Sequence, residues 1–522
     1  MTELLTAAQM SAIETAAIES GAVTGLDLME RAGRGVVEAM FEEWPDLIRT
    51  PQRAVVLCGP GNNGGDGFVV ARLLTEWGWD VDLLLYGDPE KLPPDARTNY
   101  ERWATLGHTK DMSTPGALSD LTRPDILVDG LFGTGLGRPV EGDLAQVLQD
   151  VNSLREGVGT KVVAIDLPSG LCSDSGKHLG AFATADLTVS FHRAKLGHYL
   201  DRGPARCGRV VVKSIGLEHG EHGSGTPRPA KHAPVTLAAA EAHHLAKKAD
   251  AHKYAHGHAL ILSGGAGTTG AARLSALGAL RVGAGLVTVG VPPSAQMEVA
   301  CQITALMLKR VEDGEALREV LGDDRINALA LGPGLGLDRA RALVPAALGA
   351  EHTPSVVLDA DALTAYTEEP EGLFGMLHEA CVLTPHAGEF ARLFPDIARK
   401  LNAAPTKGPA YSKLDATSDA AQRAGCVVLF KGPDTVIAAP DGRCCINSAQ
   451  YDRAAPWLAT AGSGDVLAGF ITGLLARGLD PMPAAETAAW LHVECARSFG
   501  PGLIAEDLPE ELPKVFGALG LA

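Results

Sequence analysis

The sequence predicts an α/β protein with two domains, each built on a largely parallel sheet. Short apolar runs alternate with helical patterns in both halves of the chain, as in parallel strands covered by helices on both faces. The chain has 522 residues, whereas single hydrophobic cores stop growing near ~250–300 residues. Residues 217–234 are rich in Gly, Pro, His and charge and lack apolar periodicity, which is typical of a linker. We therefore expect domains at 1–217 and 235–522, joined by a linker over 218–234.

The first half has one clear amphipathic helix, expected over 26–43, because its apolar residues recur on one helical face. The apolar run 54–58 predicts a buried strand, which leads into a glycine-rich loop and then a helix from about 65 to 77. Further buried strands of the same sheet are expected at 81–86, 126–128, 162–165, 187–191 and 210–212.

The second half shows the same alternation of short apolar strands and helices, but it does not repeat the sequence of the first half. Six short apolar runs are expected to be strands, at 259–262, 286–291, 328–331, 356–358, 382–383 and 427–430. The longest helical patterns between them are expected at 271–282, 464–476 and 483–499.

Composition restricts the partners and the compartment. The formal net charge is −18, which argues against nucleic acid, because phosphate backbones require clustered Lys and Arg. The nine cysteines are scattered and lack metal-ligand spacing, so we expect free thiols in a reducing cytosol. The sequence starts without a basic leader and has no run of ~18 apolar residues. We expect a cytoplasmic protein without a membrane span that forms a homo-oligomer.

Polar residues follow three strands of the first half. The loop GPGNNGGDGF at 59–68 can bring backbone amides close to an anion at a helix N-terminus. Asn63, Asp129, Asp166 and Ser169 come after three successive strands, the last two after the same one, and ligands of open parallel sheets bind at the carboxyl ends of strands. Their oxygens suit a hard cation. The alternative for each aspartate is a helix cap.

The second half carries AGSGDVLAGF at 461–470, directly before an apolar helix. Gly462 and Gly464 bracket the expected helix N-terminus, and Asp465 lies in its first turn. Such backbone amides stabilise a phosphoryl group in transfer, and the carboxylate stands where a hydroxyl would be phosphorylated. The alternative is a favourable charge at a helix N-terminus, worth only ~0.3–1 kcal/mol.

Four more loops of the second half follow strands and combine glycine with polar residues, as a nucleotide site requires. They are GPGLG at 332–336, VLDADAL at 357–363, LTPHAGEF at 383–390 and KGPDT at 431–435. We expect His386 to face the ligand, because it lies between Pro385 and Gly388 at a strand end. Glu389 either caps the following helix or has another role.

The first half resembles the NAD(P)H-hydrate epimerase family. The resemblance rests on LMERAG at 28–33, GPGNNGGDG at 59–67, VDGLFGTGLGRP at 128–139 and DLPSG at 166–170. It implies a Rossmann-like three-layer fold, interconversion of the R and S epimers at C6 of hydrated NAD(P)H, and potassium held by Asn63, Asp129 and Ser169. It also implies substrate contacts from Asn62, Asn63, Gly64, Gly65, Asp66, Gly133, Thr134, Gly135, Leu136, Gly137, Arg138, Pro139 and Asp166. Our hypothesis makes Asp166 the acid–base group.

The second half resembles the ribokinase-like superfamily and, within it, the ADP/ATP-dependent NAD(P)H-hydrate dehydratases. The motifs are HKYAHGHALILSGG at 252–265, GAARLSALGALRVGAGLVTV at 270–289, GPGLG, DADAL, TPHAGEF and AGSGD. The resemblance implies that the adenine nucleotide contacts Lys431, Gly432, Pro433, Asp434, Thr435 and Gly464. It implies that the hydrated nucleotide contacts Ala271, Gly334 or Gly336, His386 and Asp465.

The chemistry implied by this second resemblance is phosphorylation of the substrate, as in a kinase, followed by elimination of phosphate. Asp465 takes the proton of the C6 hydroxyl of the S epimer, the donor phosphorylates it, and phosphate leaves as the ring double bond returns. Mg²⁺ shields the donor phosphates. We expect ADP as the donor in preference to ATP, and its conversion to AMP. Two segments depart from the family pattern, SAQYDRAAPWLAT at 448–460 and an irregular stretch expected at 396–413.

Two other functions remain open at this point. A small-metabolite kinase would use the second half only and would leave the first half unexplained. A regulatory nucleotide-binding protein would not need Asp166 and Asp465.

Overall fold

The computed structural model describes residues 2–114, 116–118, 121, 123–217, 234–247, 252–405, 408 and 410–521. The chain forms two compact units, which are described separately. The first unit comprises Glu3–Pro234 and Ala404–Ser412, and the second comprises Met1–Thr2, Val235–Ala403 and Lys413–Ala522. The expected linker lies outside the described residues except for Pro234.

The first unit holds a sheet of seven strands in the order β4-β3-β2-β5-β6-β7-β8, with every neighbouring pair parallel. The strands are β2 (Arg53–Cys58), β3 (Asp80–Leu85), β4 (Thr109–Asp111), β5 (Ile126–Gly130), β6 (Lys161–Ile165), β7 (Leu187–Phe191) and β8 (Arg209–Lys213). The chain turns to opposite sides after β2 and β5, so the boundary between these two strands is the switch point where open parallel sheets bind ligands.

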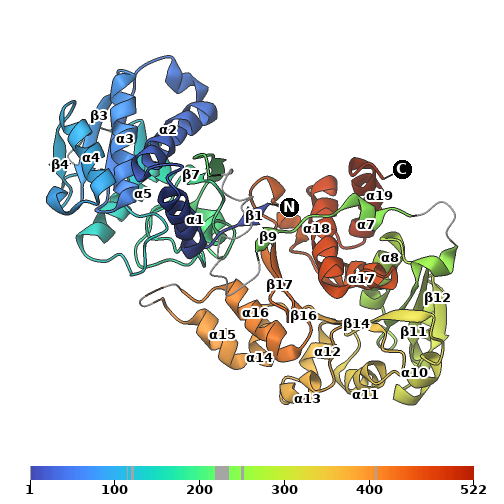
Figure 1. The fold of residues 1–522 in the computed structure, drawn as a ribbon. Helices are drawn as coiled ribbons and strands as arrows, with labels where there is room; N and C mark the ends of the chain where they lie inside the picture. Colours follow the sequence, from blue (N-terminus) through green and yellow to red (C-terminus); the bar gives the residue numbers. More distant parts are fainter. Residues whose placement is uncertain are drawn as a thin grey trace. The chain divides into compact units, whose positions relative to one another are not determined.

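Helices cover both faces of this sheet, as Figure 1 shows for the elements labelled α2 to α5. Alternate residues of β2 join two apolar clusters, because side chains of a strand point to opposite faces. Val56 packs in the cluster that contains residues of α2, α3 and α4, whereas Val55 packs in the cluster that contains residues of α5. The helices are α1 (Ala7–Glu19), α2 (Gly25–Glu43), α3 (Asn62–Glu76), α4 (Pro94–Ala104), α5 (Asp143–Val158) and α6 (Gly203–Arg206).

All six strands expected in the first half are present, and the helix expected over 26–43 is α2. The glycine-rich segment is a correction, since we expected a loop as far as about residue 65. Helix α3 instead begins at Asn62, with Gly61 as its N-cap. Asn-Asn-Gly-Gly has low helix propensity, but burial of Gly64, Gly65 and the following apolar residues outweighs it.

The second unit holds a larger sheet in the order β9-β18-β17-β16-β15-β14-β13-β10-β11-β12. The pairs from β16 to β12 are parallel, whereas β16, β17 and β18 pair antiparallel. The strands are β9 (Val235–Leu237), β10 (His258–Leu262), β11 (Leu286–Val291), β12 (Met307–Arg310), β13 (Ile326–Leu331), β14 (Ser355–Leu358), β15 (Cys381–Leu383), β16 (Val427–Phe430), β17 (Asp434–Ala438) and β18 (Cys444–Ser448). The switch point lies between β10 and β13.

A single apolar cluster joins one face of this sheet to α8, α17, α18 and α19. Ile261 and Ala330 of the sheet belong to it, together with Phe470 of α17. The helices are α7 (Ala242–Leu245), α8 (Gly270–Arg281), α9 (Gln296–Ala300), α10 (Gly314–Val320), α11 (Leu337–Leu348), α12 (Asp361–Thr364), α13 (Pro370–Phe374), α14 (Ala387–Leu393), α15 (Pro395–Asn402), α16 (Lys413–Ala424), α17 (Ser463–Ala476), α18 (Pro481–Phe499) and α19 (Asp507–Ala518).

The α/β class and the parallel sheets are confirmed, as are the six strands and three long helices expected in the second half. The stretch 396–413 is not irregular throughout, because α15 and the start of α16 occupy its two ends. In the described part of the chain, no helix is long and apolar enough to cross a membrane.

Candidate functional site

The loops after β2 and β5 pack tightly at the switch point of the first unit. A Cβ atom at Gly59 would lie 1.8 Å from the carbonyl oxygen of Leu131, so only glycine allows this approach. Asn63 faces the same β5 loop, since its Oδ1 would lie 2.8 Å from a Cβ atom at Gly133. The Nδ2 of Asn63 is buried and has no hydrogen-bond partner in the described part of the chain.

Asp129, near the end of β5, and Ser169, in the loop after the neighbouring strand β6, contact each other directly. The Ser169 hydroxyl donates to Asp129 Oδ1 at 2.6 Å, and the Ser169 amide donates to Oδ2 at 2.8 Å. The Phe132 amide donates to Ser169 Oγ at 3.0 Å. Asp129 is fully buried, and this burial raises its pKa although the bonds from Ser169 oppose the shift. A buried carboxylate with only neutral donors around it is suited to a cation.

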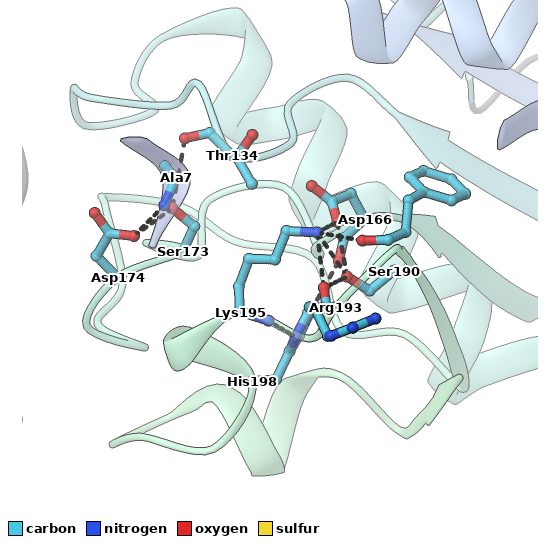
Figure 2. Close-up of polar contacts among 10 residues, drawn as sticks. Ala7, Thr134, Asp166, Ser173, Asp174, Ser190, Arg193, Lys195 and His198 are labelled. Atoms are coloured by element: carbon cyan, nitrogen blue, oxygen red, sulfur yellow. Dashed lines mark hydrogen bonds and ion pairs between the residues drawn. The ribbon is translucent and has the colours of Figure 1, made fainter. Parts of the chain in front are cut away.

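Asp166, directly after β6, pairs with a lysine that the sequence did not point to. The Lys195 ammonium donates to Asp166 Oδ1 at 2.7 Å, and the Ser190 hydroxyl donates to the same oxygen at 2.9 Å. Figure 2 shows the Lys195 ammonium pointing toward Asp166 and Ser190, with His198 below it in this view. Asp166 has a φ of 64°, an unusual value for a residue with a Cβ atom, and such strain concentrates at functional sites.

Two further carboxyl groups lie in the electrostatic range of Asp166. Burial raises the pKa of Glu14, on α1, and the Asp166 charge adds to this rise. Burial also raises the pKa of Asp66, on α3, well above its usual range, with Glu14 and Asp166 as further causes. Neither side chain forms a hydrogen bond or ion pair within the described residues. The first unit thus holds three carboxyl groups that act on one another electrostatically, one of which pairs with a buried ammonium.

The expected substrate loop, residues 133–139, is half-exposed and is tied to neighbouring segments. Ser173 donates to the Thr134 carbonyl at 3.4 Å, and the adjacent Asp174 accepts the amide of Ala7 at the start of α1 at 2.8 Å. The Gly408 amide, from the Ala404–Ser412 segment of the first unit, donates to the carbonyl of Gly137 at 2.9 Å.

The loops after five strands of the second unit also meet. A Cβ atom at Gly264 would lie 1.9 Å from the Gly334 carbonyl oxygen, and one at Gly332 would lie 1.7 Å from the Asp359 carbonyl oxygen. The Lys431 amide donates to the Pro385 carbonyl at 2.9 Å. The loops expected to bind nucleotide are therefore neighbours along one edge of the sheet.

Asp465 lies in the first turn of α17, beside an ion pair at this edge. Lys431 Nζ contacts Asp359 Oδ1 at 2.7 Å and would lie 3.6 Å from a Cβ atom at Gly464. Burial and then the Asp359 charge raise the pKa of Asp465 to about 6, while Lys431 opposes the shift. A carboxyl group with this pKa is suited to proton transfer near neutral pH.

A cavity of about 520 Å³ opens beside the GSGD turn. Five of the six residues expected to contact the adenine nucleotide line it, namely Lys431, Gly432, Pro433, Thr435 and Gly464. Asp434 does not line it and instead pairs with Lys413 at 2.7 Å. The rest of the lining is mostly apolar and includes Leu467, Ala489 and Val493, which suits a planar base.

Only some of the residues expected to contact the hydrated nucleotide lie close to one another. A Cβ atom at Gly334 would lie 3.5 Å from that of Ala271, whereas Gly336 is exposed and its amide donates to Asp361. His386 is 55% exposed and caps α14, with Nδ1 accepting the Gly388 amide at 2.9 Å. Glu389, whose role was open, accepts the His386 amide in the same capping box.

Sequence reasoning missed Lys195, Ser190 and His198 in the first unit and Asp359 in the second. The available signals were weak. Lys195 and His198 directly follow the strand expected at 187–191, and Asp359 is the first aspartate of the DADAL segment. A lysine after a buried strand is usually exposed, so its burial could not be read from the sequence.

These features define a two-site α/β enzyme, in which each unit places a carboxylate and a lysine after parallel strands, at the edge of the sheet that also carries the glycine-rich loops. Two family models match the chain: a YjeF-related N-terminal domain at residues 25–197 and an NAD(P)H-hydrate dehydratase domain at 259–514. A bifunctional NAD(P)H-hydrate repair enzyme of Moorella thermoacetica is 36% identical over 98% of this chain and 96% of the relative. The chain belongs to the family of bifunctional NAD(P)H-hydrate repair enzymes.

Shorter relatives match the halves separately. An NAD(P)H-hydrate epimerase of Rhodobacter capsulatus is 48% identical over 42% of this chain and 100% of the relative. The crystal structure of an ADP/ATP-dependent NAD(P)H-hydrate dehydratase from Bacillus subtilis, co-crystallised with ATP and Mg²⁺, is 27% identical. It covers 55% of this chain and 99% of that chain, with a TM-score of 0.43.

Proposed function

We propose that the first unit interconverts the R and S epimers of hydrated NADH and NADPH and that the second unit dehydrates the S epimer to NAD(P)H. Membership in the bifunctional family supports both activities, since the relationship spans nearly the whole chain. The observation that carries the proposal is the carboxylate–lysine pairing in each unit, Asp166 with Lys195 and Asp359 with Lys431, the latter beside Asp465.

In the first unit, Asp166 is the acid–base group. Epimerisation moves protons and removes the C6 stereocentre for a time, which requires a group that takes a proton and returns it. Substrate contacts come from the segments 62–66 and 133–139, which the tight packing of the β2 and β5 loops brings to the same end of the sheet. Asn62, at the start of α3, is exposed and available to a ligand.

Asn63, Asp129 and Ser169 fit a potassium ion. All three offer oxygen ligands, and Asp129 and Ser169 already touch each other. The buried Asp129 carboxylate lacks a cationic partner among its hydrogen bonds, and the Asn63 amide is not committed to a protein acceptor. A bound cation would supply positive charge for a phosphate or an anionic intermediate in this unit.

In the second unit, the 520 Å³ cavity takes the adenine nucleotide. Lys431, Gly432, Pro433, Thr435 and Gly464 line it, and Asp434 is the sixth contact that we propose. The preferred phosphoryl donor is ADP, and ATP is the alternative donor. Mg²⁺ would neutralise charge on the phosphates of the donor. Ala271, Gly334 or Gly336, His386 and Asp465 contact the hydrated nucleotide.

Dehydration then follows from the position of Asp465. Its carboxylate takes the proton of the C6 hydroxyl, and the hydroxyl oxygen attacks the terminal phosphoryl group of the donor while AMP leaves from ADP. Loss of phosphate from C6 and of a proton from C5 restores the ring double bond. The net reaction converts hydrated NAD(P)H and ADP into NAD(P)H, AMP and phosphate, with the Gly462–Gly464 turn stabilising the phosphoryl group.

Product analysis tests this proposal. Purified full-length protein is given hydrated NADH with ADP or ATP, and NADH absorbance, AMP and phosphate are measured. Recovery of NADH with equal amounts of phosphate and of the spent donor, AMP from ADP or ADP from ATP, supports the dehydratase. A stable phosphorylated product would instead establish a kinase. We retain the predictions of a homo-oligomer and a cytoplasmic location, which analytical ultracentrifugation and cell fractionation would test.

A further inference from the structure

We propose that Lys195 is a positioning residue of the epimerase reaction, which pairs with one oxygen of Asp166 and so presents the other oxygen to the substrate. We further assign His198 as the brace that fixes the backbone of both residues. This inference rests on the proposed role of Asp166 as the acid–base group.

The Lys195 side chain is 1% exposed, which is rare for lysine because an ammonium loses its hydration on burial. Its Nζ contacts Asp166 Oδ1 at 2.7 Å and Ser190 Oγ at 2.9 Å. It also donates to the carbonyl oxygens of Arg193 at 3.1 Å and Phe191 at 3.2 Å. Asp166 is the only ionisable group among these four partners, so the ammonium and this carboxylate balance each other's charge.

The contacts distinguish the two oxygens of Asp166. Oδ1 accepts from both Lys195 and Ser190, whereas Oδ2 has no hydrogen-bond partner within the described residues. Because the side chain is held through Oδ1, the direction of Oδ2 is fixed. Oδ2 is therefore the oxygen that exchanges a proton with the substrate.

The neighbouring carboxyl groups explain why an ammonium is needed. The Asp166 charge acts on Glu14 of α1, on Asp66 of α3 and on His198 beside it. Like charges favour protonation of one member of such a cluster. Among the described carboxyl groups, Lys195 forms an ion pair with Asp166 alone and so places a positive charge beside it, while burial and the neighbouring charges raise the pKa of the other two carboxyl groups.

His198 joins the backbones of the two paired residues. Its Nδ1 accepts the Lys195 amide at 2.9 Å, so its Nε2 carries the hydrogen and donates to the Asp166 carbonyl at 2.8 Å. Burial lowers the pKa of His198 to about 4, which keeps the ring neutral and this tautomer in place at neutral pH. The brace helps to hold Asp166 in its left-handed conformation.

This arrangement permits a balanced ring-opening route for epimerisation. Asp166 Oδ2 takes the C6 hydroxyl proton, the C6–O bond becomes a carbonyl, and the N1–C6 bond breaks with its electrons on N1. Asp166 then passes the proton that it took from the hydroxyl to N1. After rotation about the bond next to C6, the same steps run in reverse on the other face of the carbonyl. No oxidant, reductant or other reactant is consumed.

The test compares Lys195→Met with a matched control, Lys213→Met, in the full-length chain. Lys213 also forms an ion pair in the first unit, with Glu42 at 2.7 Å, but lies outside the site. Epimerase rates are measured on the R epimer across pH, and dehydratase rates are measured on the S epimer. We expect Lys195→Met to lower the epimerase rate at pH 7 by about 100-fold. The acid limb of the pH–rate profile should also move to higher pH, because the Asp166 carboxyl group loses the opposite charge beside it. Lys213→Met keeps the wild-type limb.

Two further variants test the same inference if Lys195→Met does not fold. Ser190→Ala removes one of the two donors to Oδ1 and should move the acid limb in the same direction by a smaller amount, whereas Lys195→Arg retains a cation and should keep the limb nearest to wild type. A wild-type limb in Lys195→Met or in Ser190→Ala overturns the inference. Asp166→Asn distinguishes a failure of the positioning role of Lys195 from a failure of the proposed acid–base role of Asp166. An Asp166→Asn protein that still epimerises at the wild-type rate would refute the role of Asp166 itself.

Discussion

Replacing Asp359 by asparagine should make the dehydratase reaction less sensitive to acid. Burial and then the Asp359 carboxylate raise the pKa of Asp465 from 3.8 to about 6, and Lys431 lowers it. Asp359→Asn removes the repulsive charge and releases Lys431 from its ion pair. Both changes favour the ionised form of Asp465. Because the base must be ionised, activity is lost as the pH falls, and the variant should lose it at a lower pH.

The size of the effect follows from the order of the two causes. With a pKa of about 6, Asp465 is about 90% ionised at pH 7 and about 10% ionised at pH 5. Burial is the larger cause and remains in the variant, so we expect the midpoint of the acid limb to fall by about one pH unit, equivalent to about 1.4 kcal/mol. The rate at pH 5 relative to pH 7 should then be about five times the wild-type ratio.

The assay is the dependence of kcat/KM for the S epimer on pH at saturating ADP, since this parameter reports groups of the enzyme without bound substrate. The shape of the profile is used, because the variant can also lose absolute rate. Asp338→Asn is the control, since Asp338 is an exposed carboxylate on α11 of the same unit. A midpoint in Asp359→Asn at or above the wild-type value would refute the reasoning.

Three other changes test separate parts of the structure. Asp129→Asn should abolish activation of the epimerase by potassium, seen as a rate that no longer rises when KCl replaces choline chloride; continued activation would place the ion elsewhere. Ala489→Trp should fill part of the cavity beside Gly464 and raise the KM for ADP at least about tenfold, and an unchanged KM would mean that ADP binds outside this cavity. Ala410→Asp buries a charge against Cys172 and Leu179 and should destabilise the first unit by about 1–3 kcal/mol, measured by thermal unfolding, while dehydratase activity on the S epimer persists.

The strands could be predicted because continuous apolar runs dominate parallel sheets, and β11 has the expected bounds. The hairpin β17–β18 was missed. Asp434 and Thr435 were expected to lie in a loop, and the sequence of β18 contains Asn and Ser, which interrupt the apolar pattern of a buried strand. The segment Ala404–Ser412 could not be assigned to the first unit, because the sequence around it belongs to the second. Such long-range packing leaves no local pattern.

The polar residues at strand ends were predicted, but their partners were not. Parallel topology alone brings Asp129 and Ser169 to one edge of the sheet, and the structure joins them by a hydrogen bond. The partner of Asp166 is 29 residues further along the chain, and its burial depends on the packing of β7 and the turns after it. His386 shows the opposite case, because its position after a strand also makes it a helix cap.

The most direct test measures NADH recovered from each pure epimer, with ADP, by the wild-type chain and by Asp166→Asn and Asp465→Asn. Two independent sites predict that Asp166→Asn recovers NADH from the S epimer at the wild-type rate but from the R epimer only as fast as it epimerises spontaneously. Asp465→Asn should equilibrate the epimers and yield no NADH. Wild-type recovery from the R epimer by Asp166→Asn, or NADH formation by Asp465→Asn, would contradict the account.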